Sequence, residues 1–239
     1  MKIRAMTFNI QHTVDFMNGS LNPELMANTI RAFNPDFCVL NEVFGHQDGA
    51  QIVFEDQAKL IAELAGMPFF AFRPATIVAG SPYGNAIVSR RPMASCKTVM
   101  IPDPPVRDDP NAAYETRCII AADFGKYVVL GSHFGLPVPE KELAVKTVLN
   151  TLENLEKPVI LCGDFNMTPD DNILAPIFAR LRDTAAVMTG QKLSFPSDRP
   201  QMKIDYIFAS EEFEIACADI PPVIASDHRP HIADLVLPD

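Results

Sequence analysis

The sequence predicts an α/β fold in which two β-sheets pack face to face and helices cover the outside. Short apolar runs alternate along the chain with segments of helical periodicity. Some of these runs contain no polar position, as in 37–40 (Phe-Cys-Val-Leu) and 159–162 (Val-Ile-Leu-Cys). A strand that is apolar on both sides must be covered on both faces. Two packed sheets with outer helices meet this requirement, whereas a one-sided sheet does not.

The strand candidates are rich in Val, Ile, Phe and Cys and are bounded by Gly, Pro or Asp. In chain order they are residues 2–10, 36–41, 69–73, 84–89, 94–101, 116–124, 126–133, 158–162, 204–209, 213–218 and 230–237. Most of the 21 prolines fall at the edges of elements or in the expected long loops, where a missing N–H costs little. These loops are residues 11–22, 43–53, 102–113 and 184–203.

Four segments show the spacing of amphipathic helices. They are residues 23–33, 54–65, 140–155 and 171–181. In the third, six apolar side chains from Leu143 to Leu155 fall mostly on one face, Pro139 lies near the start and Pro158 follows the end. In the second, alanines and Ile61 share a face and Gly66 ends the helix.

The length of 239 residues and the 48% hydrophobic content predict one domain spanning residues 1–239. The same composition excludes collagen-like, low-complexity and disordered chains. No apolar run approaches the ~20 residues that cross a bilayer, and residues 1–10 are too polar for a secretory leader. The five cysteines are widely spaced without a Cys-x-x-Cys pair, which disfavours zinc and indicates free thiols. We therefore expect a cytoplasmic protein.

The charge balance limits the partners. Lys and Arg total 20 against 30 Asp and Glu, which gives a formal net charge of −10. Proteins that bind nucleic-acid backbone carry a basic stripe, because neutralising phosphates supplies most of that affinity. Here the longest basic cluster is the pair Arg90-Arg91. The composition therefore disfavours tight binding of duplex DNA, although a bound divalent cation would offset some carboxylates.

Polar side chains follow several apolar strands, and three others stand inside a strand (Asp205) or just before the last one (Asp227 and His228). They are Asn9, Glu42, His133, Asp164, Asn166, Asp205, Asp227 and His228. If these strand ends lie on one rim of the sandwich, four carboxylates, two carboxamides and two imidazoles meet there. Burying that much negative charge is prohibitive without a cation. Oxygen ligands without a thiolate suit Mg²⁺ or Mn²⁺. The sequence therefore predicts a site for Mg²⁺ or Mn²⁺, ions that keep several waters and take one or two carboxylates together with substrate phosphate.

The segments that carry these residues resemble the endonuclease/exonuclease/phosphatase superfamily. In chain order the matching motifs are Thr7-Phe8-Asn9-Ile10, Asn41-Glu42-Val43, Gly84-Asn85-Ala86-Ile87-Val88-Ser89-Arg90, Ser132-His133-Phe134, Gly163-Asp164-Phe165-Asn166, Ile204-Asp205-Tyr206-Ile207-Phe208 and Ser226-Asp227-His228-Arg229-Pro230. The resemblance spans residues 7–230. It implies a four-layer α/β sandwich of two mainly antiparallel, mixed sheets. It also implies metal-dependent phosphoester hydrolysis at one rim of those sheets.

The resemblance also implies roles for single residues. Glu42 would be the main Mg²⁺ ligand with Asn9 beside it, and Asp227 would serve a metal or its water shell. Asn41 stands where many members have Gln. The continuation of the first motif lacks the pattern of abasic-site enzymes, and the chain has no Trp, which disfavours a DNA-repair activity.

The same resemblance implies the catalytic groups. Asp164 would hold or deprotonate the attacking water, and Asn166 would hydrogen-bond a phosphoryl oxygen. Asp205 would orient His228 through a ring nitrogen, as carboxylates orient imidazoles in other hydrolytic sites. His133 would stabilise the pentacovalent phosphorus or assist the leaving group. Either Asp164 or His228 would be the general base.

Some residues have two interpretations. Asn85 is either a turn residue before a strand or a group that faces phosphate. Arg117 either pairs with Glu115 or clamps phosphate, and the planar guanidinium favours the clamp. We expect Asn85 and Arg117 to bind substrate. The remaining histidines are expected to be ordinary surface or strand residues; they are His12, His46 and His231.

Three functions follow from these observations. The first is a metal-dependent hydrolase, a phosphodiesterase or phosphatase that acts on a small or lipid-derived phosphoester by metal-assisted attack of water. The second is an endonuclease, exonuclease or DNA-repair enzyme. The third is a binding module that has lost catalysis. The intact motifs favour the first two over the third, and the acidic charge favours the first over the second.

Overall fold

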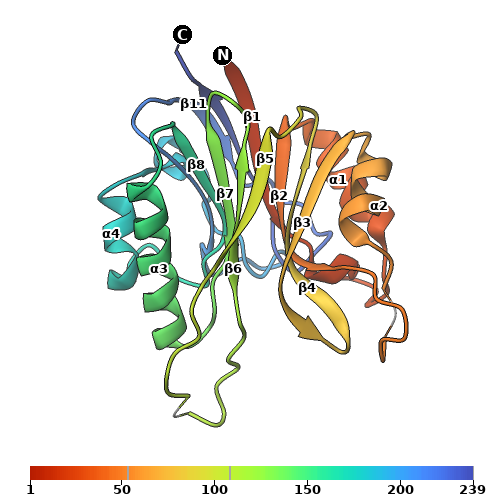
Figure 1. Cartoon of the computed structure of the whole chain (residues 1–239). Coiled ribbons are helices and arrows are strands. Elements are labelled where there is room, and N and C mark those ends of the chain that lie inside the picture. The colour runs from red at the N-terminus through yellow and green to blue at the C-terminus, as the bar shows by residue number, and fades with distance from the viewer. Residues whose placement is uncertain (53, 108, 239) are drawn as a thin grey trace.

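The computed structural model describes residues 1–52, 54–107 and 109–238. Two β-sheets of six strands each pack face to face, and helices lie on the outer side of each sheet (Figure 1). The predicted α/β sandwich is therefore confirmed. Of the predicted loops 43–53 and 102–113, residues 53 and 108 lie outside the described residues, as does residue 239 of the predicted domain.

The first sheet has the strand order β11-β12-β1-β2-β4-β3. Its strands are β1 (Lys2–Asn9), β2 (Phe37–Phe44), β3 (Phe69–Val78), β4 (Ser81–Ser89), β11 (Glu214–Asp219) and β12 (His231–Val236). Only β1 and β2 run parallel, and the other neighbours are antiparallel. The parallel pair places the ends of β1 and β2 on the same rim.

The second sheet has the strand order β5-β6-β7-β8-β10-β9. Its strands are β5 (Ser95–Met100), β6 (Cys118–Asp123), β7 (Val128–His133), β8 (Val159–Asp164), β9 (Arg182–Asp183) and β10 (Asp205–Ala209). Here β7 and β8 form the parallel pair, with His133 in register with Asp164. The antiparallel strand β10 begins beside the end of β8, so that Asp205 is in register with Asp164.

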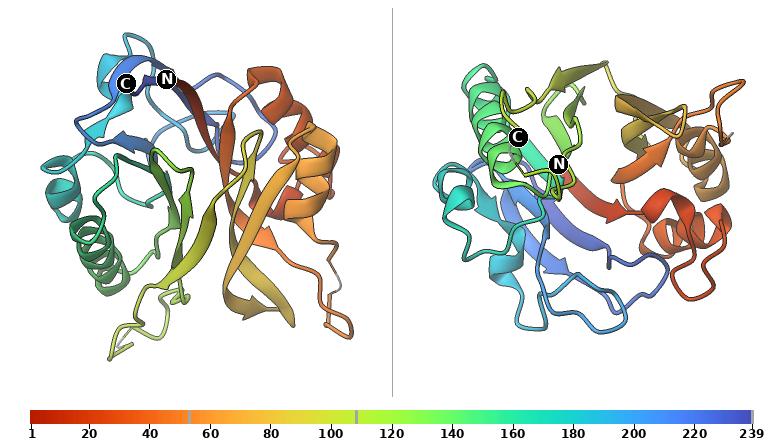
Figure 2. Two further views of the ribbon diagram at one scale, coloured as in Figure 1. Left: turned by 45° about the horizontal axis from the view of Figure 1, so that its top comes forward. Right: turned by 90° about the horizontal axis from the view of Figure 1, so that it is seen from below.

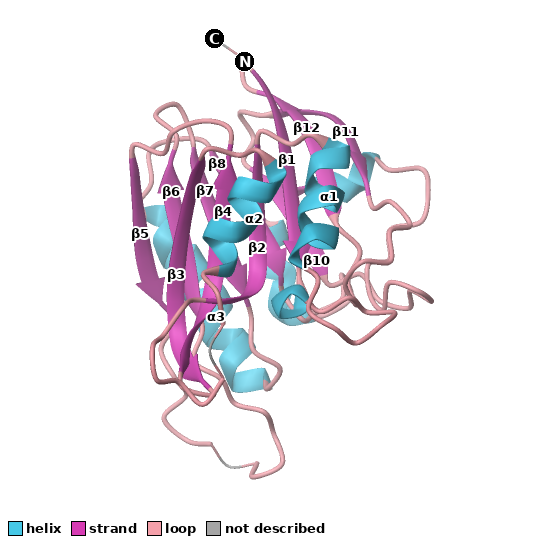
Figure 3. Ribbon diagram, turned by 90° about the vertical axis from the view of Figure 1, so that its right-hand side faces the viewer, coloured by secondary structure: helices cyan, strands magenta, loops and turns pink. Residues whose placement is uncertain are grey.

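Two helices cover each sheet. Figures 2 and 3 show α1 (Pro23–Phe33) and α2 (Gln57–Ala65) over the first sheet, and Figure 2 shows α3 (Val138–Glu153) and α4 (Ala175–Phe178) over the second. Three apolar clusters fill the spaces between these four layers, one between the sheets and one under each helix pair. Burying apolar surface in this way is the main force that holds the layers together.

Local sequence explains where the first two helices begin and end. The side chain of Asn22 accepts the N–H of Leu25 at the start of α1, and that of Asp56 accepts the N–H of Lys59 at the start of α2. Gly66 ends α2 in the left-handed conformation, which glycine adopts without steric cost. The predicted helix 54–65 therefore began too early, because the cap at Asp56 sets the first turn at Gln57.

Several other elements also differ from the prediction. The strands predicted at 69–73 and 84–89 are longer, since β3 runs to Val78 and β4 begins at Ser81, and the helix predicted at 140–155 is α3 (Val138–Glu153). The predicted strand 36–41 runs on to Phe44, because a bulge between Leu40 and Val43 lets β2 stay paired with β4. The predicted helix 171–181 was wrong in length: only the 3₁₀ turn η2 (Asn172–Leu174) and the four-residue α4 form there. The two-residue strand β9 was not predicted.

The predicted loops also contain short ordered elements. The 3₁₀ turn η1 (Gln11–Thr13) follows β1, and η3 (Thr184–Val187) follows β9. Among the described residues, no helix is both long and apolar enough to cross a membrane. The ends of β1, β2, β7 and β8 and the start of β10 meet on the rim opposite the two chain termini, which Figure 1 marks at the top.

Candidate active site

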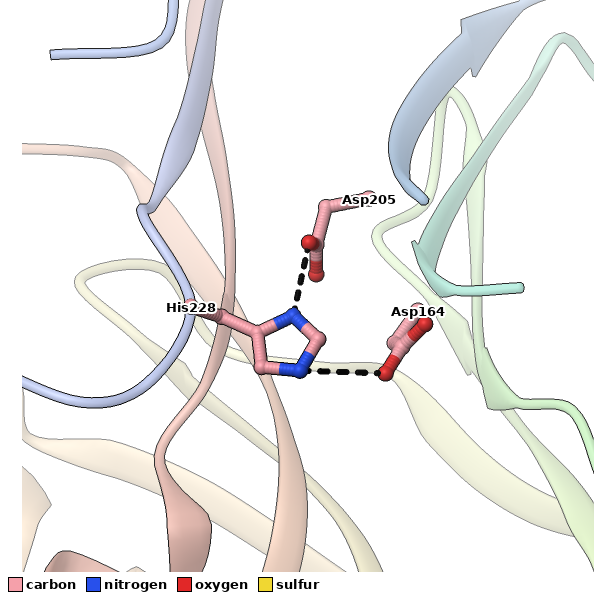
Figure 4. A group of neighbouring side chains, drawn as sticks. All are labelled: Asp164, Asp205 and His228. Carbon is pink, nitrogen blue, oxygen red and sulfur yellow. Dashed lines mark hydrogen bonds and ion pairs between the residues drawn. The ribbon is translucent and has the colours of Figure 1, made fainter. Parts of the chain in front are cut away.

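His228 joins two aspartates at the rim of the sandwich (Figure 4). Its Nδ1 lies 2.8 Å from Oδ2 of Asp205, and its Nε2 lies 3.6 Å from Oδ2 of Asp164. The two aspartates come from neighbouring strands, β10 and β8, while His228 comes from the loop before β12. All three side chains are buried. The structure therefore brings Asp205 and His228 into the contact on which the predicted orienting role depends.

The close approach of these charges shifts their proton affinities. Burial raises the pKa of Asp164, and the nearby Asp205 adds to this because a second carboxylate disfavours another negative charge. Burial alone would lower the pKa of His228. The carboxylates of Asp205 and Asp164 outweigh burial, so the pKa of His228 is raised above its ordinary value. The two carboxylates thus favour the protonated form of the imidazole.

Asn9, the last residue of β1, connects this group to Glu42. Its Nδ2 donates to Oε1 of Glu42 at 3.0 Å and to Oδ2 of Asp164 at 3.1 Å, and its Oδ1 accepts the backbone N–H of Gln11. Glu42 lies at the bulge of β2 with a φ of 59°, a left-handed conformation that turns its carboxylate toward Asn9. The structure therefore brings two of the predicted metal ligands together.

Glu42 remains ionised in this setting. Burial raises the pKa of its carboxyl group, but the contacts with His12 and Asn9 outweigh burial and lower it below the ordinary value. The side chain is 21% exposed, so one part of the carboxylate faces solvent. A charged oxygen ligand that is partly open to solvent suits a divalent cation.

His133, at the end of β7, faces Asp164 from the other side. Its Nε2 lies 3.4 Å from Oδ2 of Asp164, and Nη1 of Arg117 donates to its Nδ1 at 3.0 Å. Burial, aided by the charge of Arg117, lowers the pKa of His133 well below its ordinary value. Because Nδ1 accepts from Arg117, the neutral ring carries its proton on Nε2. Asn166 donates from Nδ2 to the carbonyl of Phe134 at 2.9 Å and lies 3.1 Å from Nε2 of His133.

The structure places the three other predicted residues as follows. Asp227 adjoins His228, and burial raises its pKa, as does the charge of Glu42. Arg117 lies between Glu115, at 2.7 Å, and His133. Asn85 is buried within β4; it donates to the carbonyl of Cys118 at 3.0 Å and accepts from Asn41 at 2.7 Å.

Two residues at the site were not predicted. Nδ1 of His12 lies 3.5 Å from Oε2 of Glu42, and its ring is 36% exposed. Asn41 is fully buried, and its Oδ1 accepts the backbone N–H of Asp164 at 3.0 Å. One signal pointed to Asn41: it is a carboxamide beside Glu42 in a strand of apolar residues. No comparable signal marked His12.

The donor set fits a hard divalent cation. The carboxylates of Asp164 and Asp205 lie around His228, with one polar atom of each of the three side chains within 4.8 Å of the others, and Asn9 links Asp164 to the carboxylate of Glu42. While its ring is protonated, His228 supplies no ligand, so the oxygens are the candidate ligands. Oδ1 of Asp205 is buried and has no hydrogen-bond partner among the described residues. Buried carboxylate oxygens without a partner are costly, and oxygen-rich sites favour Mg²⁺ or Mn²⁺.

Comparison with known proteins agrees with this geometry. Residues 6–228 match the model of the endonuclease/exonuclease/phosphatase family. A family protein of known structure from Beutenbergia cavernae is 25% identical with a TM-score of 0.80, covering 99% of this chain and 72% of the other. No curated protein matches the chain.

Two further solved structures share the fold. The mannosyl-6-phosphatase of Bacteroides thetaiotaomicron is 16% identical with a TM-score of 0.77, covering 98% of this chain and 99% of the other. The human Nocturnin catalytic domain, solved with a bound sulfate anion, is 18% identical with a TM-score of 0.75, and the match covers 99% of this chain and 94% of the other. With the family match over residues 6–228, the chain belongs to the endonuclease/exonuclease/phosphatase family.

Proposed function

We propose that the protein is a phosphoester hydrolase that depends on Mg²⁺ or Mn²⁺ and acts on a small or lipid-derived phosphoester. The observation that carries this proposal is His228, which lies between Asp205 and Asp164 while Asn9 links Asp164 to Glu42. This arrangement combines a carboxylate of raised pKa, a protonated imidazole and an ionised carboxylate that is partly open to solvent. Hydrolysis of a phosphoester needs a base for water, donors for phosphoryl oxygens and a ligand for a cation.

Glu42 would hold the cation, with Asn9 and Asp227 as further ligands or as partners of its water shell. When bound, the cation would polarise the phosphoryl group and offset the charge of the carboxylates. The solvent-facing part of Glu42 leaves room for both water and substrate beside it. Mg²⁺ characteristically takes one or two carboxylates and keeps several waters.

Asp164 would accept the proton of the attacking water. Its raised pKa makes it a better base near neutral pH than an ordinary aspartate. His228 cannot fill this role while it carries a proton, and its pKa is raised by the two aspartates. It would instead donate from Nε2 to a phosphoryl oxygen, with Asp205 fixing the ring through Nδ1.

The opposite side of the site would also supply donors to the phosphoryl group. His133 carries its proton on Nε2, and the Nδ2 amide group of Asn166, also a donor, lies beside that nitrogen. Both would donate to oxygens on which negative charge grows in the transition state. Arg117 would bind the phosphate through the part of its guanidinium that His133 and Glu115 leave open, and we retain Asn85 as a substrate-binding candidate from sequence.

The charge of the chain supports a small substrate over duplex DNA. The formal net charge is −10, and the sequence contains no basic stripe to neutralise a polynucleotide backbone. The relatives of similar fold include a mannosyl-6-phosphatase. A nuclease remains the second candidate, because the family name covers endonucleases and exonucleases.

A panel of phosphoesters tests the proposal. Wild-type protein would be assayed with Mg²⁺ and with Mn²⁺ on sugar phosphates, lipid headgroup diesters and bis-p-nitrophenyl phosphate, with and without EDTA. We expect turnover that EDTA abolishes and that Glu42→Ala removes. The matched control is Glu63→Ala, since Glu63 is an exposed glutamate on α2 that pairs with Lys59. Undiminished turnover in EDTA or in Glu42→Ala would overturn the proposal.

The same assay separates the other two functions. Nicking of supercoiled plasmid at a rate that matches the best small substrate, with DNA affinity that falls steeply as salt increases, would favour the nuclease. A folded, metal-loaded protein that turns over nothing on the panel would favour the binding module.

We also propose a cytoplasmic location. All five cysteines are free thiols, and Cys38, Cys118 and Cys162 are buried. Free thiols persist in a reducing compartment. Cell fractionation with an antibody to the protein tests this, and recovery in an exported fraction would contradict it.

A further inference from the structure

A buried carboxylate in the first turn of α3 has no part in the chemistry proposed above. Glu140 is 4% exposed, and its Oε1 accepts the backbone N–H of Glu115 at 2.8 Å. Its Oε2 is buried and has no hydrogen-bond partner among the described residues. Burying a carboxylate with an unsatisfied oxygen costs free energy. Such a residue in the first turn of α3 therefore calls for an explanation, and its hydrogen bond to the backbone of Glu115 supplies one.

The partner of Glu140 begins a chain of contacts that leads to the active site. The side chain of Glu115 pairs with Nη1 of Arg117 at 2.7 Å. The same Nη1 donates to Nδ1 of His133 at 3.0 Å. Nε2 of His133 then lies 3.4 Å from Oδ2 of Asp164. Four contacts thus connect a helix outside the second sheet to the proposed general base.

The side chain of Arg117 depends on this series of contacts for its orientation. Its side chain is 12% exposed, and its Nε is buried without a hydrogen-bond partner among the described residues. Among the described residues, Nη1 contacts both Glu115 and His133, and these contacts hold the guanidinium in place. A guanidinium is planar and rigid, so fixing one end of it fixes the direction of the other donors.

Gly135 leaves the space that Glu140 occupies. A Cβ atom at position 135 would lie 1.9 Å from Oε2 of Glu140 and 2.8 Å from its Cβ and Cδ. Any larger residue at 135 would thus displace the carboxylate. Gly135 follows His133 by two residues, which places the packing of Glu140 next to the strand end that carries the histidine.

We propose that Glu140 is a positioning residue for the hydrolytic site. By holding the backbone of Glu115, it sets the Glu115–Arg117 pair, and this pair keeps Nδ1 of His133 as an acceptor and the ring proton on Nε2. Glu140 itself touches no substrate. The inference rests on the proposed function for the role of His133, but the contact chain exists whatever the substrate is.

Truncation of Glu140 tests the first of these contacts, the hydrogen bond from the backbone N–H of Glu115 to Glu140. Glu140→Ala removes the acceptor for the N–H of Glu115, whereas Glu140→Gln keeps an acceptor oxygen at that position. We expect kcat of Glu140→Ala to fall about tenfold with KM within about twofold, because misplacing a group that acts in the transition state lowers kcat. Glu140→Gln should recover kcat to within about twofold of wild type. The matched control is Glu142→Ala, an exposed position of α3.

Glu115→Ala extends the test and covers the case in which Glu140→Ala fails to fold. The side chain of Glu115 is 30% exposed, so its truncation leaves no closed cavity. We expect the same fall in kcat as for Glu140→Ala. The double variant should lose no more than either single variant, because residues that act through one partner have non-additive effects.

Nitrogen NMR of the histidine side chains gives a readout that needs no turnover. Wild-type His133 should show an unprotonated Nδ1 and a protonated Nε2, and Glu140→Ala should show both nitrogens exchanging between the two tautomers. A wild-type protein that is inactive on every phosphoester, with these NMR signals intact, would refute the proposed function and leave the contact chain standing. Unchanged kcat and unchanged His133 signals in both Glu140→Ala and Glu115→Ala would overturn the inference.

Discussion

Asn41 and Asp164 join the two sheets at the active-site rim. Oδ1 of Asn41, on β2 of the first sheet, accepts the backbone N–H of Asp164, on β8 of the second sheet, at 3.0 Å. Nδ2 of Asn41 donates to Oδ1 of Asn85 at 2.7 Å and to the carbonyl of Ser132 at 3.0 Å. One buried carboxamide therefore satisfies three groups and fixes the distance between Glu42, its neighbour in sequence, and Asp164.

Removing this carboxamide should destabilise the fold. Asn41→Ala leaves three buried polar groups without their partner, and each costs about 1–3 kcal/mol when unsatisfied. We expect the free energy of unfolding to fall by about 3 kcal/mol, measured by urea denaturation. Asn150→Ala, at an exposed position of α3, is the control and should change stability by less than about 0.5 kcal/mol. A fall of less than about 1 kcal/mol in the free energy of unfolding of Asn41→Ala would show that the contacts of Asn41 between the two sheets contribute little to stability.

Substitution of Asp205 should impair catalysis without unfolding the protein. Asp205→Asn keeps the size of the side chain but removes the charge that raises the pKa of His228 and holds its Nδ1–H. We expect kcat on the best phosphoester to fall by about 10²-fold or more, the usual range for losing a properly held acid or base. Asp170→Asn, an exposed aspartate, serves as control. Equal kcat for Asp205→Asn and wild type would remove the orienting role.

Buried His231 should make stability depend on pH. Its Nε2 accepts from Oγ1 of Thr184 at 3.1 Å, and its Nδ1 faces the carbonyl of Asp205 at 3.4 Å. Burial, aided by the charge of Lys203, lowers the pKa of His231 to about 4. Below the unfolded pKa of about 6.5, the unfolded chain binds a proton that the native protein does not. The contribution of neutral, buried His231 to the free energy of unfolding is therefore complete above about pH 6.5. It is lost as the pH falls from there to about 4.

Thermal unfolding of His231→Asn tests whether stability falls, as expected, when the pH is lowered. The wild-type protein should lose stability between pH 6.5 and pH 4.5, and His231→Asn should show a shallower slope over the same interval, whatever its stability at pH 7.5. The control is His46→Gln, because His46 is exposed and its pKa is raised rather than lowered. Parallel slopes for wild type and His231→Asn would contradict the prediction.

The strands and the rim of the fold were predictable from sequence because their signals are local. Apolar runs without polar positions mark strands that are covered on both faces, and 2–10 matches β1 (Lys2–Asn9) closely. The helix predicted at 171–181 was wrong because Leu174, Ile177 and Leu181 have helical spacing yet reach the core from a 3₁₀ turn, a short helix and a loop. Two-residue β9 has no periodicity to detect.

The candidate site was predictable as a group and less so in its contacts. Polar residues at strand ends gave Asn9, Glu42, Asp164, Asp205 and His228, and the fold brings all five to one rim. Nothing in the sequence placed His12 at Glu42. Its position follows from the left-handed conformation of η1, whose residues include no glycine to reveal it.

Other statements from sequence stay predictions. They are the catalytic and ligand roles of single residues, the single domain over residues 1–239 and the cytoplasmic location. The roles of single residues depend on where a cation and a phosphate bind. The pattern of apolar and polar residues along the sequence reports local structure and does not contain that information.

Direct measurement of cation binding tests the central claim that the rim carboxylates share a divalent metal ion. Mn²⁺ would be titrated into wild type, Glu42→Gln and the control Glu63→Gln, and free Mn²⁺ followed by electron paramagnetic resonance. We expect saturable binding to wild type and to the control, with affinity at least tenfold weaker in Glu42→Gln because a charged oxygen ligand is lost. Glu42→Gln that binds Mn²⁺ as tightly as wild type would contradict the account.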